Sequence, residues 1–249
     1  KTIWITGASS GIGKATAIKF ANNGWNVAVS ARREKLLNEL EEINSNIKAF
    51  PLDVTKKLNV ENCFAKIADL YKDIDICLFC TGMHDPESEK EFSSSKIREI
   101  METNFFGTVN CIESSSKYLK QRKKGHLAIV SSVAGYRGLP YAAGYCSSKA
   151  ALINLTESIN FDLKKYNVKV SIINPGFIKT PMTDVNKFHM PMIETPEFAA
   201  NKIFDGLVNK NIFEIHFPKN FTFLMKFLKF IPDWIFFKLI NRANNLYKG

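Results

Sequence analysis

Seven short apolar runs, separated by segments with helical spacing, constrain the fold of this chain more than any other feature of its sequence. The runs are rich in Val and Ile and extend over Thr2 to Ile5, Trp25 to Ser30, Ile47 to Leu52, Ile74 to Cys80, His126 to Ser131, Val168 to Ile173 and Phe213 to Phe217. Near-continuous apolar strands that alternate with helices are typical of a parallel sheet covered on both faces. The pattern predicts an α/β fold, a doubly wound seven-stranded parallel sheet with helices on both faces. The 249 residues suffice for one large domain.

Basic residues are concentrated at the C-terminal end. The net charge is +10, and residues 219–249 contain six basic side chains against one acidic one, so this segment supplies half of the excess. These residues interleave with Phe and Leu and form no continuous hydrophilic patch, so we expect no nucleic-acid partner.

The cysteines favour a reducing compartment, because they number five and most lie in apolar segments. Cys77 and Cys80 form a C-x-x-C within a predicted strand, which points them to opposite faces of the sheet. We therefore expect no metal site and no redox exchange there. No signal-like segment precedes the first strand, so a cytoplasmic protein is expected.

Glycines follow the first strand, where a doubly wound sheet binds its ligands. Gly7, Gly11 and Gly13 separate that strand from a predicted helix over Ile12 to Asn23. Glycine lets the backbone turn sharply and approach a pyrophosphate, whose charge the free N–H groups of the helix stabilise. The spacing G-x-x-x-G-x-G differs from the common G-x-G-x-x-G. A turn without a ligand is the alternative, and the loop position favours a dinucleotide site.

The end of the second strand bears on the choice between NAD and NADP. An acid there accepts from the ribose 2′-OH, whereas an arginine pairs with a 2′-phosphate. The sequence is Val-Ser-Ala followed by Arg32 and Arg33, with no carboxylate. NADP(H) is therefore the preferred cofactor, and NAD(H) is the alternative if both arginines are merely solvated residues of the next helix.

Tyr145 and Lys149 stand four residues apart at the start of a helical segment, Tyr145 to Lys164, and so project from one face. A phenol with a pKa near 10 is a poor acid–base catalyst at neutral pH. A neighbouring ammonium group favours the phenolate, so we expect Lys149 to lower the pKa of Tyr145.

Together with Thr6 to Gly13, Asn104 in Asn-Phe-Phe-Gly, Ser132 and Asn174-Pro175-Gly176, this pair resembles the classical short-chain dehydrogenase/reductase family over roughly Lys1 to Phe217. The resemblance implies a Rossmann-type oxidoreductase. In it Tyr145 donates a proton to a carbonyl oxygen while hydride arrives from the nicotinamide, and Ser132 orients that carbonyl. Lys149 holds the ribose and tunes Tyr145, and Asn104 anchors a proton-relay water. Alcohol oxidation uses the same groups with Tyr145 as the base.

The same resemblance implies the cofactor contacts. It places Asp53 and Val54 beside the adenine, and Pro175 to Thr180 around the nicotinamide amide. The full expected set is Gly7, Ser9, Ser10, Gly11, Ile12, Gly13, Arg32, Arg33, Asp53, Val54, Gly82, Asn104, Tyr145, Lys149, Pro175, Gly176, Ile178 and Thr180. It also implies a homodimer or homotetramer. One departure is Phe79-Cys80-Thr81-Gly82, where the family usually has Asn-Asn-Ala-Gly, so the asparagine contacts that brace the central strand are missing.

The segment Thr180 to Thr195 corresponds to the family's substrate lid. It is rich in apolar and adaptable side chains, namely Met182, Phe188, Met190, Pro191, Met192 and Ile193. A helix should follow it at Thr195-Pro196-Glu197. Such a lid suits a bulky apolar substrate, and ordinary packing of a surface loop is the alternative.

We divide the chain into a catalytic domain, residues 1–218, and an amphipathic basic and aromatic tail, residues 219–249. A helical projection puts Thr222, Lys226, Lys229 and Asp233 in a narrow polar stripe, with apolar side chains around the rest. Pro232 divides the tail into halves too short to cross a bilayer. Membrane-surface association through 219–242 is one expectation. The alternative is that the tail packs against its own substrate cleft or a partner subunit.

These features lead to one hypothesis and two rivals. The hypothesis is an NADPH-preferring carbonyl reductase that acts on an apolar, lipid-like small molecule or on the corresponding alcohol. The rivals are an NAD-dependent alcohol dehydrogenase and a non-catalytic dinucleotide-sensing protein, which the altered segment from Phe79 to Gly82 would permit.

Overall fold

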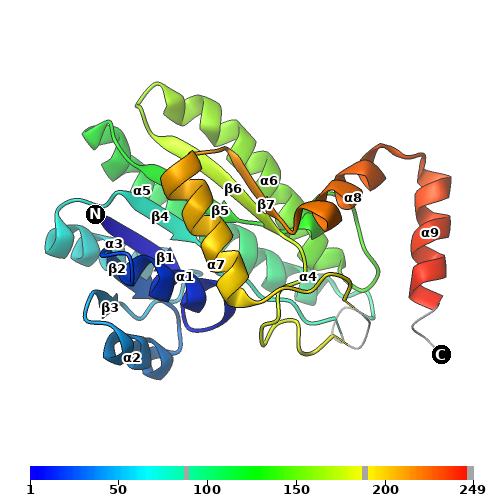
Figure 1. Cartoon of the computed structure of the whole chain (residues 1–249), viewed down its shortest axis with the longest axis horizontal. Coiled ribbons are helices and arrows are strands. Elements are labelled where there is room, and N and C mark those ends of the chain that lie inside the picture. Colours follow the sequence, from blue (N-terminus) through cyan, green and yellow to red (C-terminus); the bar gives the residue numbers. More distant parts are fainter. Residues whose placement is uncertain (87–89, 187–189, 246–249) are drawn as a thin grey trace.

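A seven-stranded parallel sheet runs through the middle of the molecule in the computed structural model, which describes residues 1–86, 90–186 and 190–245 (Figure 1). Its strand order is β3-β2-β1-β4-β5-β6-β7. The strands are β1 (Thr2–Thr6), β2 (Asn26–Ser30), β3 (Ile47–Ala49), β4 (Ile76–Phe79), β5 (His126–Val130), β6 (Lys169–Pro175) and β7 (Glu214–Phe217). The order reverses between β1 and β4, as a doubly wound sheet requires. The predicted α/β fold and all of its strands are confirmed.

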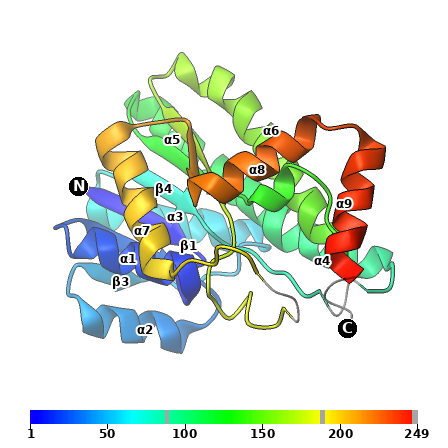
Figure 2. The same cartoon turned by 45° about the vertical axis from the view of Figure 1, so that its right-hand side comes forward.

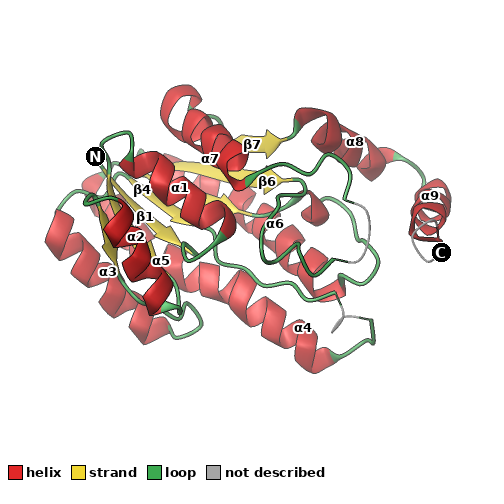
Figure 3. Ribbon diagram, turned by 60° about the horizontal axis from the view of Figure 1, so that its bottom comes forward, coloured by secondary structure: helices red, strands yellow, loops and turns green. Residues whose placement is uncertain are grey.

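Helices cover both faces of the sheet (Figure 3). The helices of the main body are α1 (Gly11–Ala21), α2 (Glu34–Ile43), α3 (Lys57–Tyr71), α4 (Ser94–Met101), α5 (Gly107–Arg122), α6 (Ala143–Lys164) and α7 (Pro196–Phe204). Two more, α8 (Lys219–Phe230) and α9 (Asp233–Asn245), follow the last strand. Helices α1, α2 and α7 share one core with the sheet, and α3, α5 and α6 share the other.

Alternation along each strand divides side chains between these two cores. On β1, Ile3 and Ile5 belong to the core under α1 and α7, whereas Trp4 belongs to the core under α3 and α5. Likewise Cys77 packs in the second core and Cys80 against the first. The expectation that this C-x-x-C points to opposite faces is therefore confirmed, and all of the cysteines are free thiols.

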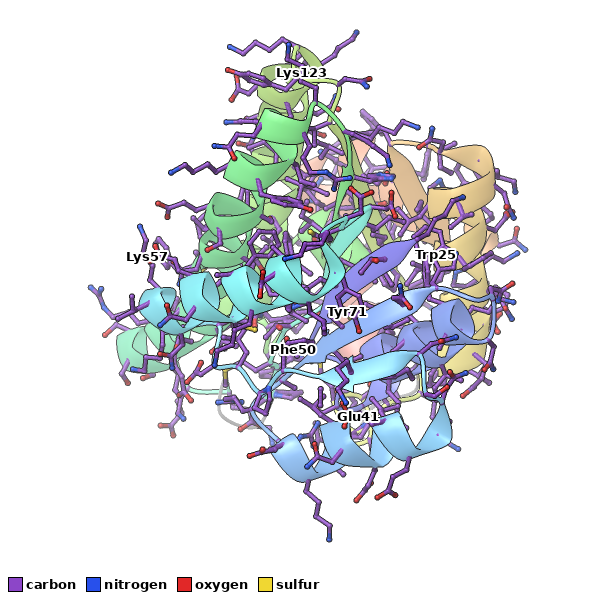
Figure 4. All side chains as sticks on the ribbon, turned by 90° about the vertical axis from the view of Figure 1, so that its left-hand side faces the viewer. Trp25, Glu41, Phe50, Lys57, Tyr71 and Lys123 are labelled. Atoms are coloured by element: carbon purple, nitrogen blue, oxygen red, sulfur yellow. The ribbon has the colours of Figure 1, made fainter. Side chains whose placement is uncertain are left out.

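The edge strand β3 is shorter than the run from Ile47 to Leu52 that predicted it. Beyond Ala49 the Phe50 and Leu52 N–H groups still donate to the Val29 and Ala31 carbonyls, and Pro51 places its missing N–H on the open edge. The Glu41 carboxylate on α2 accepts a hydrogen bond of 2.6 Å from the backbone N–H of Ala49, which occupies a donor on the open edge. Figure 4 looks onto this edge, with Glu41 and Phe50 labelled.

Candidate active site

The loop after β1 is shaped so that backbone, rather than side chains, lines one wall of the site. A β-carbon on Gly7, whose φ is +69°, would lie 2.7 Å from the backbone of Cys80. A β-carbon on Gly13 would lie 2.4 Å from the Gly7 carbonyl oxygen. No side chain fits at either position, and the loop packs directly on the end of β4.

The N-terminus of α1 fits an anionic ligand. Ser10 precedes the helix without capping it through its side chain, and no acidic residue lies in the first turn. The first N–H groups of a helix need partners, and the helix dipole favours a negative charge there. The glycine cradle and this helix end therefore fit the pyrophosphate of a dinucleotide.

A cavity of about 360 Å³ opens beside the cradle, at the carboxyl ends of the strands. Nearly all of the predicted site residues line it, from Gly7 through Arg32, Arg33, Asp53 and Val54 to Tyr145, Lys149 and Thr180. Among the predicted residues, Asn104 alone does not line this cavity, and it is fully buried. The cavity is also lined by Met182 of the predicted lid and by residues that the sequence analysis did not select, namely Ala31, Leu52, Cys80, Thr81, Thr103, Val130, Ser131, Pro181 and Thr183.

Tyr145, Lys149 and Ser132 come together on this cavity. The Lys149 ammonium nitrogen lies 5.6 Å from the centre of the Tyr145 ring and donates a 3.0 Å hydrogen bond to the Val130 carbonyl. Burial raises the pKa of Tyr145 to about 12, and a hydrogen bond with Ser132 partly opposes this shift. Burial also lowers the pKa of Lys149 to about 8.

Burial, rather than the charge of Lys149, therefore sets the direction of the Tyr145 pKa shift, and the expected lowering does not occur. The free-energy cost of removing the phenolate from water exceeds the stabilisation that its neighbours provide, so the pKa of Tyr145 rises instead of falling. The same burial destabilises the ammonium form of Lys149, which weakens its electrostatic effect. At neutral pH, Tyr145 thus holds its proton, the form that can donate to an oxygen.

Asn104 lies in a π-helical segment, Glu102–Phe106, between α4 and α5. Its side-chain oxygen accepts from the Met83 N–H at 2.7 Å, and its amide nitrogen donates to the Met83 carbonyl and to the Ser148 hydroxyl, each at 3.0 Å. Such π-helical insertions are frequent at functional sites. Here the insertion lets Asn104 tie the chain after β4 to α6.

Comparison with known proteins places this geometry in a family. Residues 1–189 match the family model described as short chain dehydrogenase. The chain belongs to the short-chain dehydrogenase family. It is 32% identical over 241 residues to an uncharacterized oxidoreductase of Myxococcus xanthus, covering 95% of this chain and 94% of that protein.

Two further relatives are informative. A 3-oxoacyl-acyl-carrier-protein reductase of Thermotoga maritima is 30% identical over 188 residues, with 74% of this chain and 76% of that protein covered. The solved structure of ElxO with NADP bound matches with a TM-score of 0.77 at 25% identity, covering 87% of this chain and 95% of that one. The short-chain dehydrogenase described here is an NAD(P)-dependent oxidoreductase.

This dehydrogenase departs from its family after β4, and the structure shows what stands there instead. The backbone N–H of Cys80 donates to the Thr6 hydroxyl at 3.3 Å, which links the ends of β4 and β1. The Cys80 backbone also forms the surface on which Gly7 packs. The segment thus keeps direct contact with the glycine loop without the usual asparagines.

His84 is a residue that the sequence analysis missed. Its imidazole ring stacks on Tyr145 with ring centres 4.4 Å apart and planes tilted by 33°. It follows Met83, whose backbone Asn104 holds, so the loop after β4 that contacts Tyr145 is itself held in place. Its place in a loop after a parallel strand was a signal that sequence reasoning could have used.

The two arginines after β2 differ in their surroundings. Arg33 donates to the Ser9 hydroxyl at 2.7 and 3.2 Å and to the Ser10 hydroxyl at 2.8 Å, so it braces the glycine loop. Arg32 faces Asp53; burial raises the pKa of this carboxyl, but hydrogen bonds from Thr55 and the charge of Arg32 leave it below its ordinary value. Both guanidinium groups border the cavity. Within the described part of the chain, no group of acidic, His and Cys side chains could hold a metal ion.

Proposed function

We propose that this dehydrogenase is an NADPH-preferring carbonyl reductase that uses Tyr145 as its proton donor. The observation that carries the proposal is the convergence of Tyr145, Lys149 and Ser132 on the cavity that the glycine cradle borders. The alcohol-to-carbonyl direction uses the same residues, with Tyr145 as the base.

The roles of the side chains follow from their positions. Bound NADP(H) supplies the hydride. Tyr145 keeps its proton at neutral pH because burial raises its pKa, and it transfers that proton to the carbonyl oxygen. The Ser132 hydroxyl, which bonds to Tyr145, orients the same oxygen. Lys149 holds the ribose, and its amino group replaces the proton on Tyr145 through a water.

Asn104 has a place in this proton path. A β-carbon on Gly82 would lie 3.5 Å from the Lys149 nitrogen and 3.7 Å from the Asn104 side-chain oxygen, so the two polar atoms flank Gly82. We propose that Asn104 positions the relay water here and contacts the cofactor only indirectly, because it lies outside the cavity lining. The other predicted cofactor residues all line the cavity.

The preference for NADPH rests on the charge at the end of β2. No carboxylate directly follows β2 to accept from a 2′-OH. Arg32 borders the cavity beside Asp53, and its guanidinium makes no hydrogen bond to a described residue. The relative ElxO was solved with NADP bound. These observations favour NADPH over NADH.

Nucleotide titration of the purified protein tests this preference. We expect the Kd for NADPH to lie at least about tenfold below that for NADH, because a guanidinium–phosphate pair is a charge-assisted contact. Arg32→Ala should weaken NADPH binding about tenfold and leave NADH binding unchanged. Arg33→Ala should weaken both, because Arg33 also holds the glycine loop.

Lys35→Ala is the matched control, since Lys35 is an exposed basic residue in the first turn of α2, just after the two arginines, and lies outside the cavity lining. It should bind both nucleotides like the native protein. Equal loss of NADH and NADPH affinity in Arg32→Ala would contradict the assignment and favour the NAD-dependent alcohol dehydrogenase.

We further propose an apolar, lipid-like carbonyl substrate. Met182 lines the cavity, and Met192 and Ile193 lie exposed further along the lid. Phe188 lies outside the described residues. The similar enzyme of Thermotoga maritima is named a 3-oxoacyl reductase, which is a precedent for an acyl ketone within the family.

A series of ketones of increasing chain length tests the substrate class. Each added methylene that reaches the lid should raise kcat/KM by up to about fourfold, the effect of burying one CH₂ group. Met182→Ser should flatten this slope while leaving nucleotide affinity unchanged. A flat series in the native protein would instead mean that the lid side chains only pack on the surface.

For assembly and location, we propose a homodimer or homotetramer in the cytoplasm. Exposed Phe106 beside α5 and Phe161 on α6 supply apolar surface for such an assembly. We also propose that 1–218 form the catalytic domain and that 219–249 add a contact surface to it.

A further inference from the structure

Helix α8 packs on the catalytic domain with its polar stripe turned inward. The Thr222 hydroxyl is buried and lies 2.6 Å from His216 Nδ1, and Lys226 donates to the Glu214 carboxylate at 2.5 Å. Of the predicted polar stripe, Thr222 and Lys226 therefore face the body, where β7 presents polar His216 and Glu214 to the helix, whereas Lys229 is exposed.

Apolar residues on the flanking side of α8 complete the contact. Phe221 and Met225 form a small buried cluster with Val133, against which Phe177 also packs. The Phe221 and Phe177 rings are 5.4 Å apart, and a β-carbon on Gly176 would lie 2.7 Å from the Phe221 ring. Since Gly176 lines the cavity, α8 lies directly behind the site.

The remaining face of α8 presents aromatic side chains to solvent. Phe223, Phe227 and Phe230 follow one helical face and are 59%, 63% and 82% exposed. An amphipathic helix normally buries its apolar face. Here the inward face is already occupied. Phe223 meets the His216 ring, with 5.2 Å between ring centres, and Phe227 and Phe230 stay largely exposed.

Helix α9 extends this surface away from the body (Figures 1 and 2). Trp234 and Phe237 on it are 70% and 58% exposed. Arg137 fixes the joint between the helices: its guanidinium stacks 4.1 Å from the centre of the Phe236 ring, bonds to the carbonyls of Leu228 and Lys229 and pairs with Asp233. We call residues 219–242 the hook. Its exposed aromatics belong to an arrangement that the protein holds in place.

The charges of the hook select the kind of partner. Lys226 is paired with Glu214, and Asp233 with Arg137. Exposed Lys229, Lys238 and Arg242 have no ion pair within the described chain, so the surface is aromatic and cationic. Two copies facing each other through it would bring cations together with no acid to balance them. An anionic, apolar partner is favoured instead.

A lipid surface has this chemistry. No helix in the described residues is long and apolar enough to cross a bilayer. Aromatic and basic side chains on short helices suit the interface, where rings enter the acyl boundary and cations meet anionic headgroups.

We propose that the hook binds the surface of an anionic phospholipid bilayer through Phe223, Phe227, Phe230, Trp234 and Phe237, with Lys229, Lys238 and Arg242 at the headgroups. The surface is separate from the catalytic side chains, so the lipid-binding proposal does not depend on the reductase assignment. Because Phe221 backs onto the cavity wall, the bound bilayer lies close to the site, which suits a substrate delivered from lipid.

Vesicle binding by the full-length protein tests the proposal. We expect it to sediment with vesicles of mixed phosphatidylcholine and phosphatidylserine at low salt, and poorly with phosphatidylcholine alone. Trp4 and Trp25 are buried, so a blue shift of tryptophan emission on binding will come from Trp234. Phe227→Ser with Phe230→Ser should lower partitioning at least about tenfold.

Two further variants make the test specific. Lys229→Glu with Lys238→Glu should abolish the preference for anionic vesicles. Leu70→Ser, which removes an exposed apolar side chain from α3, should bind like the native protein. Absence of binding to anionic vesicles at low salt overturns the proposal. A second outcome would also overturn it: the native protein does not bind vesicles, and light scattering shows a concentration-dependent dimer. Phe227→Ser with Phe230→Ser would disrupt that dimer. NADPH titration of each variant reports separately on the catalytic domain.

Discussion

Replacing Tyr145 by Phe is expected to lower kcat for carbonyl reduction by about a thousandfold, within the range that a positioned acid–base group contributes. The change removes only the hydroxyl that bonds to Ser132 and leaves the ring that His84 stacks on. Affinity for NADPH should therefore stay unchanged in a fluorescence titration, while steady-state turnover is lost.

The pH dependence of turnover by the native protein is a second test of the role of Tyr145. Burial raises the pKa of Tyr145 to about 12, so the phenol keeps its proton through the neutral range. Reduction by the native protein should then vary little around neutral pH, whereas alcohol oxidation, which needs the phenolate, should increase as the pH rises.

Tyr166→Phe, just beyond the far end of α6, is the matched control and should keep full activity. A native protein that binds NADPH but shows no Tyr145-dependent turnover with any ketone tested would support the dinucleotide-sensing alternative.

Gly13→Ala is expected to have a comparably large effect on nucleotide binding. The added β-carbon would lie 2.4 Å from the Gly7 carbonyl oxygen, which belongs to the backbone of the same cradle and cannot rotate away. The loop must shift, and a shift withdraws the N–H groups that we assign to the pyrophosphate. We expect at least a hundredfold rise in the Kd for NADPH, about 3 kcal/mol, and a destabilisation of about 1–3 kcal/mol.

Gly138→Ala is the matched control, because a β-carbon there meets nothing within 4 Å and its backbone is not left-handed. It should bind NADPH and unfold like the native protein. Normal NADPH affinity in Gly13→Ala would mean that the glycine loop is not the pyrophosphate site.

The sequence predicts the sheet and most of the site because both depend on short-range patterns. Apolar runs mark parallel strands, and the residues just after them converge wherever such strands end side by side. Thus Gly7, Ser132 and Tyr145, far apart along the chain, line one cavity as expected.

What the sequence could not show depends on burial and on distant partners. The rise of the Tyr145 pKa follows from the desolvation of its side chain in the folded protein, which no spacing reveals. A helical projection of α8 shows its polar stripe but not that His216 and Glu214 contact it. Nor does it show that Arg137, 91 residues before Leu228, bonds to the end of the helix. The orientation of the hook is a tertiary property.

Arg137 connects the segment before α6 to helices α8 and α9. It belongs to the segment that joins Ser132 to Tyr145, two of the side chains we assign to proton transfer, and it also grips the joint of α8 and α9. Helix α9 is therefore attached to the same segment that connects those two side chains. A chain cut after Pro218 would lose that anchor and uncover Val133 and Phe177, so it would be a loosened enzyme rather than the same enzyme with a shorter end.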